Sequence, residues 1–262
     1  MDEKIKEIKK LIVETAHNAK VGHLPSSFSS LEIMYTLYKR ILTPENLNNP
    51  QRDMVIISKE HARLGQVCVL AYLGFLKKEY LASYMQNGGK LGHDLYNLNQ
   101  NDTDAVDYAC GSLGHGLSVA AGFALANKNR KIYVIVGDGE LQEGSNWEAL
   151  MFIIQHNIKN LVVIIDKNSM QIDDFTKNII DTSSKVNDVF AAMGFDVVEC
   201  DGHSLEDLNV AFEKEVEKPK CVIAKTIKGD GLEFLHETKR FNHFHASPLS
   251  EDEYRIAVGT LA

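Results

Sequence analysis

The chain has 262 residues, of which 44% are hydrophobic and 24% are charged, and its net charge is −8 at pH 7. This composition is typical of a soluble globular protein, and the length suits one large core, so we expect a single domain over residues 1–262. The acidic balance argues against nucleic acid as a partner, because phosphate binding needs a basic face. No apolar run reaches the roughly 18 residues of a membrane span.

The apolar pattern predicts alternating helices and strands. Helical spacing predicts helices over 3–19, 31–38, about 65–75, 117–128, 147–154, 186–193 and 204–216. Short aliphatic runs predict strands over 53–58, 132–136, 161–165, 195–200 and 221–227. The stretches 43–52, 77–109, 171–185 and 229–249 lack clear periodicity and are predicted to be irregular. This order indicates an α/β fold with a three-layer parallel sheet and helices on both faces.

A turn and a helix cap are predicted near the N-terminus. The sequence Gly-His-Leu-Pro at 22–25 predicts a turn, and Ser29 or Ser30 can cap the helix that follows it.

The cysteines and the N-terminal sequence indicate in which cellular compartment the protein is found. The four cysteines, Cys68, Cys110, Cys200 and Cys221, show no CxxC or other metal-ligand spacing, and three of the four lie in or beside apolar runs. Buried free thiols in a reducing compartment are therefore expected. The opening residues, MDEKIKEIKK, are charged and precede no long apolar stretch, so they do not resemble a signal peptide. We expect a cytoplasmic protein.

The segment 131–170 predicts a strand–helix–strand unit with polar residues where each strand ends. Asp138 lies between Gly137 and Gly139 after the first strand, and Asn168 follows the second. Open α/β sheets bind ligands at the carboxyl ends of parallel strands. Carboxylate and amide oxygens suit Mg2+ or Ca2+, and glycine amides can approach a bulky anion. The segment is therefore a candidate metal and diphosphate site, although a strand end with a helix-capping Asp gives the same pattern.

Histidines recur at predicted turns and strand ends. They are His23, His61, His93, His115 and His245. None belongs to an HExxH pair, which argues against a zinc site of that type. A loop histidine often has only a structural role, but five of them near one face indicate a polar pocket suited to a hydroxylated, anionic substrate.

The sequence GDG, followed about thirty residues later by an Asn after an apolar run, resembles the thiamine diphosphate motif. The longer sequence GDGELQEGSNWEAL is similar to that of transketolases. This resemblance implies the thiamine diphosphate-binding fold of the domain that holds the diphosphate, with thiamine diphosphate and Mg2+ as cofactors and Ca2+ as a possible substitute. Further matches run in order from His23 to Leu249: VGHLPSS, SKEHA, GHD, GSLGHG and FHASPL.

The resemblance implies a role for each matching residue. His23, His93 and His245 would act on the substrate, with Glu143 linking the two active sites of a dimer. The implied cofactor contacts are His61, Gly111, Leu113, Gly139, Glu143, Asn168, Ile172 and His245. The implied metal ligands are Asp138, Asn168 and the carbonyl of Met170. Departures from the family pattern at Leu24, Pro25, Glu60, Ser112 and His115 bear on the substrate more than on the cofactor, and His115 is either a substrate group or a packing change.

The chain ends shortly after PLSEDEY, where the first domain of a transketolase would end. It therefore resembles the N-terminal subunit of a split transketolase, which would transfer a two-carbon ketol unit from a ketose phosphate to an aldose. The resemblance implies a partner subunit with the pyrimidine-binding and C-terminal domains, in an α2β2 heterotetramer. The sequence leaves the sugar open among pentose phosphates, a branched sugar phosphate and a sulfosugar phosphate.

Two other functions share parts of this pattern. A 2-oxoacid decarboxylase or the α-type chain of a 2-oxoacid dehydrogenase also carries GDG and a later Asn, but the histidine series favours the ketose reaction. A non-catalytic assembly protein of the same fold is opposed by the intact Asp138, Glu143 and Asn168. No GxGxxG follows a predicted strand, which argues against a nicotinamide cofactor.

Overall fold

The computed structural model describes residues 1–91, 103–172, 174–236, 245 and 247–262. Within these residues, five parallel strands form one sheet in the order β1-β2-β3-β5-β4. The strands are β1 (Met54–Ile57), β2 (Ile132–Gly137), β3 (Leu161–Lys167), β4 (Asp196–Asp201) and β5 (Lys220–Lys225). Helix α6 (Gly144–Gln155) joins β2 to β3, which confirms the predicted strand–helix–strand unit.

Alternate residues of each strand enter two separate cores, because successive side chains point to opposite faces of a sheet. In β2, Tyr133 and Ile135 belong to one core, whereas Ile132, Val134 and Val136 belong to the other. All five are buried. A sheet that is apolar on both faces requires a layer of helices on each.

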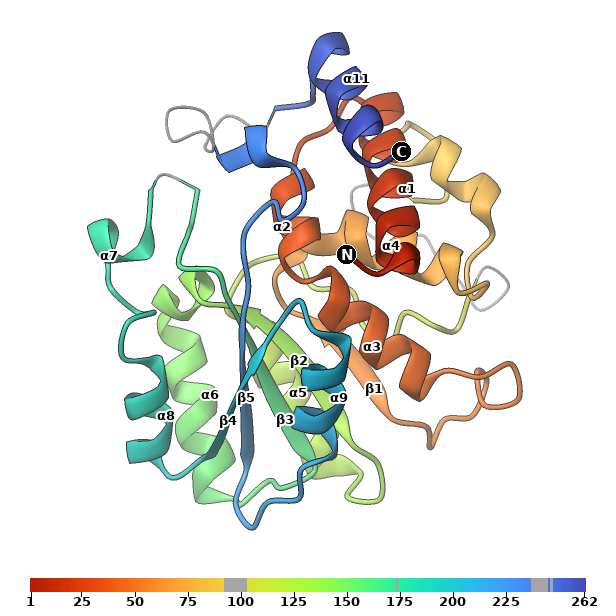
Figure 1. Cartoon of the computed structure of the whole chain (residues 1–262). Helices are drawn as coiled ribbons and strands as arrows, with labels where there is room; N and C mark the ends of the chain where they lie inside the picture. The colour runs from red at the N-terminus through yellow and green to blue at the C-terminus, as the bar shows by residue number, and fades with distance from the viewer. Residues whose placement is uncertain (92–102, 173, 237–244, 246) are drawn as a thin grey trace.

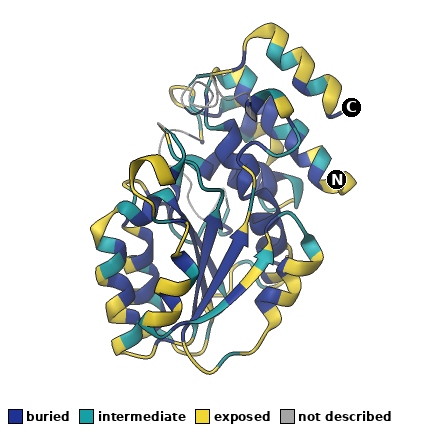
Figure 2. Cartoon of the chain, turned by 60° about the vertical axis from the view of Figure 1, so that its left-hand side comes forward, coloured by how far each residue is buried: buried dark blue, intermediate teal, exposed yellow. Residues whose placement is uncertain are grey.

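Helices cover both faces, which confirms the predicted three-layer parallel fold (Figure 1). Helices α3 (Leu31–Ile41) and α9 (Leu205–Glu213) pack on one face, and α5 (Gly116–Ala126) and α8 (Val186–Met193) pack on the other. In Figure 2 the buried strands lie between helices whose outward surfaces are exposed. Hydrophobic burial on two faces is therefore the main source of stability of this sheet.

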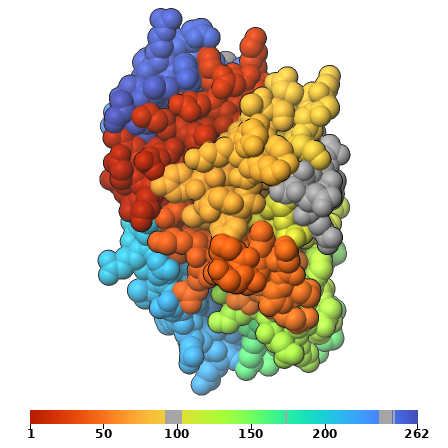
Figure 3. Space-filling view, turned by 90° about the vertical axis from the view of Figure 1, so that its right-hand side faces the viewer, coloured from red at the N-terminus to blue at the C-terminus, as the bar shows by residue number. Residues whose placement is uncertain are grey.

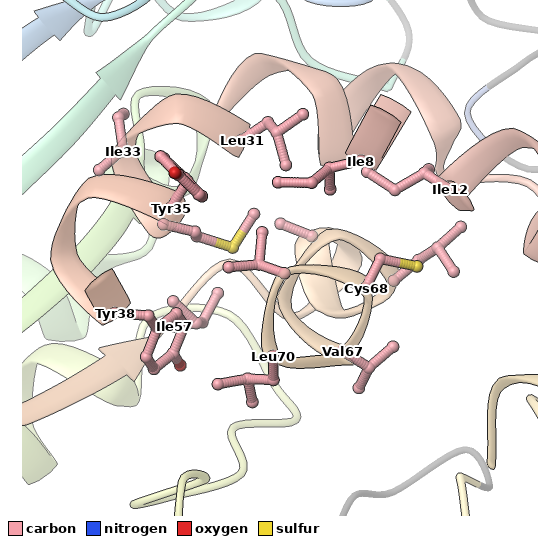
Figure 4. Close-up of a cluster of buried hydrophobic side chains, with 14 of the residues drawn as sticks. Ile8, Ile12, Leu31, Ile33, Tyr35, Tyr38, Ile57, Val67, Cys68 and Leu70 are labelled. Carbon is pink, nitrogen blue, oxygen red and sulfur yellow. The ribbon is translucent and has the colours of Figure 1, made fainter. Parts of the chain in front are cut away.

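A group of helices continues one core beyond the sheet. These helices are α1 (Glu3–Ala19), α2 (Leu24–Ser29) and α4 (Arg63–Tyr72), and they pack with α3. Figure 4 shows Cys68 of α4 directed towards Ile8 and Ile12 of α1, in a cluster that also contains Leu31 of α3. Seen from the side, the first 80 residues form a large part of one face of the molecule (Figure 3). This cluster fixes the segment that carries His23.

The C-terminal helix α11 (Glu251–Thr260) packs against α1. Its first turn is a capping box, in which Ser250 Oγ accepts from Glu253 N and the Glu253 carboxylate accepts from Ser250 N. Lys6 Nζ also donates to the carbonyl of Ala262 at 2.6 Å. The two ends of the chain are thus held side by side.

The structure adds short elements that the sequence analysis did not predict. They are α2, α7 (Thr176–Ile179), α11 and the 3-10 helices η1 (Glu60–Ala62), η2 (Lys78–Ser83), η4 (Gly139–Gln142) and η5 (Glu233–His236). The predicted turn at 22–25 is shorter than expected, since α2 begins at Leu24 and places Pro25 in its first turn, where proline is favoured. Ser30 precedes α3, but its side chain forms no capping bond.

The structure also bears on the expectations about the cysteines and about membrane-spanning helices. All four cysteines are free thiols, and Cys200 is half-buried whereas the other three are buried. Across the described ranges, no helix combines the length and the apolarity needed to cross a membrane.

Two glycines of helix α5, one packed against the end of β1 and one in open space, allow a matched test of how closely this helix packs on the strand. A Cβ at Gly116 would lie 2.9 Å from the Cα of Ser58, whereas a Cβ at Gly122 would meet no atom within 4 Å in the described part of the chain. We expect Gly116→Ala to lower the free energy of unfolding by about 1–3 kcal/mol, since backbone must move. Gly122→Ala should raise it by about 0.5–1 kcal/mol through helix propensity. Urea unfolding measures both, and equal effects would contradict the packing described.

Candidate functional site

A cavity of about 160 Å³ opens where strands β1, β2, β3 and β5 end. Eight of the residues named from the sequence line it: His61, Leu113, Asp138, Gly139, Asn168, Met170, Ile172 and His245. Six further residues complete the wall: Ser26, Lys59, Gly137, Glu140, Gln171 and Lys228. The cavity therefore lies at the edge of the sheet where the sequence predicted a ligand.

A buried ion pair forms the floor of this region. Lys59 follows β1, Asp166 lies near the end of β3, and their side chains are 1% and 0% exposed. Lys59 Nζ, Ser29 Oγ and Thr226 Oγ1 all donate to the Asp166 carboxylate. Burial would raise the pKa of Asp166, but the Lys59 ammonium and these bonds hold it below its ordinary value. Four segments of the chain therefore meet at one ionised carboxylate.

Asp138 lies beside this pair at the end of β2. Its Oδ1 accepts from Gly139 N at 2.9 Å, and its Oδ2 accepts from Ser169 N at 2.6 Å and from Ser183 Oγ. The side chain is buried, and burial raises the pKa of Asp138 to about 6, with the Asp166 charge adding to the rise. A bound cation would reverse this shift, because it stabilises the ionised form.

Asn168 is oriented by its neighbours. Its Nδ2 donates to Ser29 Oγ at 2.9 Å, and its Oδ1 accepts from Met170 N at 3.0 Å. Asn168, Met170 and Asp138 line the same cavity. One carboxylate, one amide and one main-chain carbonyl form an oxygen donor set of the kind that Mg2+ and Ca2+ prefer. The raised pKa of Asp138 and this donor set fit a hard divalent cation.

Two of the predicted histidines, His61 and His245, line the cavity, and His23 lies beside them without lining it. The ring centroids of His23 and His245 are 4.9 Å apart, and those of His61 and His245 are 5.6 Å apart. His23 N also donates to the His245 carbonyl at 3.0 Å. Burial lowers the pKa of His61 well below its ordinary value and lowers that of His245 to about 3. The imidazoles of His61 and His245 are therefore neutral at pH 7 and can hydrogen-bond hydroxyl groups without carrying charge.

Lys228 is a second buried cation, which the sequence analysis did not select. It is 6% exposed, lines the cavity, and donates to the Gln171 carbonyl at 3.4 Å. Burial, together with the nearby Lys59 charge, lowers the pKa of Lys228 to about 8. No ion pair of Lys228 is present among the described residues, whereas Lys59 is paired with Asp166. The cavity therefore offers a positive charge that an anion would stabilise.

Glu140 joins a glycine turn to the sheet. Its carboxylate accepts from Gly114 N at 2.9 Å, from Gly137 N at 3.1 Å and from Ser58 Oγ. Gly114 has a φ of 87°, and a Cβ there would lie 2.6 Å from Ser145 Oγ, so the position requires glycine. Glu140 thus fixes the turn at 111–116, which brings Leu113 to the cavity.

The remaining predicted residues lie outside the cavity or outside the described residues. Glu143 is exposed at the start of α6, Gly111 is exposed in its turn, and His115 is exposed at the start of α5. His93 lies outside the described residues. The roles assigned to all of these residues stay predictions.

Comparison with known proteins agrees with this arrangement. The family model described as "Transketolase, thiamine diphosphate binding domain" matches residues 1–260. The chain belongs to the transketolase family. The predicted family, its fold and its class of enzyme, a transferase of ketol units, are therefore confirmed.

Individual relatives of the transketolase family are similar over nearly the whole chain. One of them is a subunit of the apulose-4-phosphate transketolase of Actinobacillus succinogenes, which is 39% identical over 253 residues that cover 93% of this chain and 90% of that protein. The 6-deoxy-6-sulfo-D-fructose transketolase subunit SqwG of Clostridium sp. is 34% identical, with 97% and 93% covered. The transketolase structure from Campylobacter jejuni has a TM-score of 0.82 at 27% identity, and the chain spans 43% of it.

Three residues of the cavity wall that were not selected from the sequence, Lys59, Glu140 and Lys228, share a position at or just after the end of a predicted strand. Lys59 and Lys228 follow predicted strands, and Glu140 follows the GDG sequence directly. The rule that selected Asp138 and Asn168, namely a polar residue at the carboxyl end of a parallel strand, applies to all three. It did not rank them, because the sequence does not give the order of the strands.

Lys228 should make the stability of the chain without ligand depend on alkaline pH. Its pKa is about 8 in the fold and 10.5 in the unfolded chain, so the unfolded chain binds more protons between these values. Stability should therefore rise as the pH rises through this window. At pH 7, Lys228→Met should be more stable than wild type by about 2–3 kcal/mol, and this difference should shrink by pH 10.

Urea unfolding at pH 7 and pH 10 checks this, with Lys225→Met on the exposed end of β5 as the control. A Lys228→Met chain less stable than wild type at pH 7 would contradict the account.

Glu140→Gln should loosen the glycine turn. A glutamine amide replaces one acceptor oxygen with a donor, which faces either Gly114 N or Gly137 N. We expect the backbone amide that faces the new donor, that of Gly114 or that of Gly137, to exchange at least roughly tenfold faster and the free energy of unfolding to fall by about 1–3 kcal/mol. NMR hydrogen exchange measures the first effect. Glu148→Gln, at an exposed position of α6, is the control and should change neither quantity.

Proposed function

We propose that this chain is the diphosphate-binding subunit of a two-chain transketolase. The observation that carries the proposal is one cavity in which the oxygen donors of Asp138 and Asn168 lie on the same wall as the buried ammonium of Lys228. A complex of a divalent cation with a diphosphate has the two charges that this cavity can match. A plain strand-end cap would not need a buried cation beside it.

Different residues of the chain would bind the metal ion, the diphosphate and the rings of the cofactor. Asp138, Asn168 and the Met170 carbonyl would hold Mg2+, with Ca2+ able to substitute. The diphosphate would contact Gly139 N, His61, Lys228 and His245, and the rings would contact Gly111, Leu113 and Ile172. Thiamine diphosphate would supply the carbanion-stabilising chemistry, while the chain binds and orients it.

The histidines favour a hydroxylated substrate. Imidazoles at His23, His61 and His245 can donate to or accept from sugar hydroxyls, and His93 would join them. The substrate would be a ketose phosphate that gives a two-carbon ketol unit to an aldose. The two relatives named for apulose 4-phosphate and for 6-deoxy-6-sulfo-D-fructose support a donor with an anionic group.

A partner chain would complete the site. The exposed Glu143 and Gly111 lie on surface that a second chain can reach. The partner would supply the pyrimidine-binding and C-terminal domains of an α2β2 assembly, to which residues 1–262 would contribute one domain. The three free buried cysteines support a cytoplasmic location. The relatives from Actinobacillus succinogenes and Clostridium sp. are themselves named as transketolase subunits, which supports the division into two chains.

Asp138→Asn tests the proposal. It removes the charged metal ligand while it keeps the size of the side chain, so Mg2+-dependent binding of thiamine diphosphate should weaken at least about a hundredfold. Asp252→Asn on the exposed face of α11 is the control and should bind as wild type. Titration calorimetry measures both.

The same variant should abolish ketol transfer by the chain reconstituted with its partner. Unchanged ketol transfer in Asp138→Asn would contradict a catalytic role for this site, and turnover of pyruvate but of no ketose would favour the 2-oxoacid reaction instead.

A further inference from the structure

A second cluster of ionisable side chains, two of them buried and two half-buried, includes Asp230, which follows Lys228 of the cavity wall by two residues. It consists of Lys9 on α1, Glu32 on α3, His203 after β4 and Asp230 after β5. Lys9 Nζ lies 2.5 Å from Asp230 Oδ2 and 3.6 Å from Glu32 Oε1, and it donates to the Asp230 carbonyl at 2.9 Å. Lys9 is fully buried and Glu32 is 3% exposed. We call these four residues the Lys9 cluster.

The Lys9 cluster is complete without a metal ion. The ligand atoms of Glu32, His203 and Asp230 lie within 4.8 Å of one another, a spacing that could hold a cation. The Lys9 ammonium already contacts both carboxylates. His203 Nδ1 lies 3.0 Å from Glu32 Oε2, and His203 Nε2 accepts from Ile227 N at 2.8 Å, so both ring nitrogens are engaged. Burial lowers the pKa of His203, but the Glu32 carboxylate raises it above its ordinary value. Because Nε2 accepts from Ile227 N, it carries no proton, and the geometry therefore assigns a neutral ring with its proton on Nδ1.

The cluster holds the backbone on both sides of Lys228. His203 binds Ile227 N, and Lys9 binds the carbonyl and the carboxylate of Asp230. Between them, Gly229 N donates to the Pro25 carbonyl at 3.1 Å. The segment 227–230 is therefore anchored at three residues around Lys228. Because each anchor lies on a different element, the position of Lys228 depends on contacts far away in the sequence.

We propose that the Lys9 cluster is a positioning device for diphosphate binding, which acts by holding the Lys228 ammonium in the cofactor cavity. The inference rests on the proposed function, since it takes Lys228 as a ligand of the diphosphate. His203 is the residue that links the cluster to the segment most directly, because its Nε2 is the acceptor for Ile227 N. Loss of this bond frees the backbone one residue before Lys228, and a charge contact weakens as the ammonium moves away.

Two substitutions of His203 separate the two contacts of its ring. In His203→Asn, the amide ends near the position of Nδ1, so it can still donate to Glu32 but cannot reach Ile227 N. In His203→Gln, the amide reaches the position of Nε2, so its oxygen can accept from Ile227 N. Both side chains are neutral and leave the charge of the cluster unchanged. His156→Asn, at an exposed position after α6, is the matched control.

The test uses the full-length chain with Mg2+ and inorganic diphosphate as the probe. Titration calorimetry should show that His203→Asn binds about tenfold more weakly than wild type, and that His203→Gln and His156→Asn bind within about threefold of it. Hydrogen exchange should be faster in peptides that cover 225–232 in His203→Asn alone, with thermal unfolding measured in parallel. In a Lys228→Met background, His203→Asn should cause no further loss of affinity.

The outcomes separate this inference from the proposed function. If wild type binds and His203→Asn binds equally well, the inference is overturned. It is also overturned if His203→Asn weakens binding just as much in the Lys228→Met background, since the effect would then not act through Lys228. If wild type itself binds no diphosphate, the proposed function is contradicted, and the binding role of the cluster is contradicted with it. Faster hydrogen exchange in His203→Asn would still show that His203 anchors the segment 227–230.

Discussion

The buried ion pair between Lys59 and Asp166 is the interaction on which the site depends. It joins the end of β1 to the end of β3, and Ser29 and Thr226 bring α2 and the end of β5 to the same carboxylate. Removing one partner of such a pair leaves an uncompensated charge and costs about 3–5 kcal/mol. Because Asp138 also feels the charge of Asp166, the pair sets the electrostatics of the cavity as well as its shape.

Around this pair, the chain keeps two groups in environments that disfavour their charges. Burial raises the pKa of the Asp138 carboxyl to about 6 and lowers that of the Lys228 ammonium to about 8. Neither group forms an ion pair with a described residue, although the Asp138 and Asp166 charges partly offset the fall in the pKa of Lys228. A metal diphosphate would supply both partners at once. The stability lost at these two positions is consistent with a site built for a ligand rather than for the fold.

The sequence alone was sufficient to predict the strands of the sheet and part of the site. Five-residue aliphatic runs identify buried strands, and the residues after β2 and β3 gave Asp138 and Asn168, because parallel strands end at one edge. Lys228 was not selected, since its importance follows from β5 lying next to β3, and strand order is a tertiary property. The Lys9 cluster joins residues more than 200 positions apart, which no local pattern reveals. Helix α11 is different, because Ser250 and Glu253 carry a capping-box signal that could have predicted it.

The central claim is that this chain holds the tail of the cofactor, while another chain is needed for its ring. Calorimetric titration of the full-length chain with thiamine diphosphate, inorganic diphosphate and thiamine, each with Mg2+, tests it most directly. The account predicts that thiamine diphosphate and inorganic diphosphate bind within about tenfold of each other and that thiamine does not bind measurably. Binding of thiamine as tight as that of thiamine diphosphate, or failure of inorganic diphosphate to bind, would contradict it.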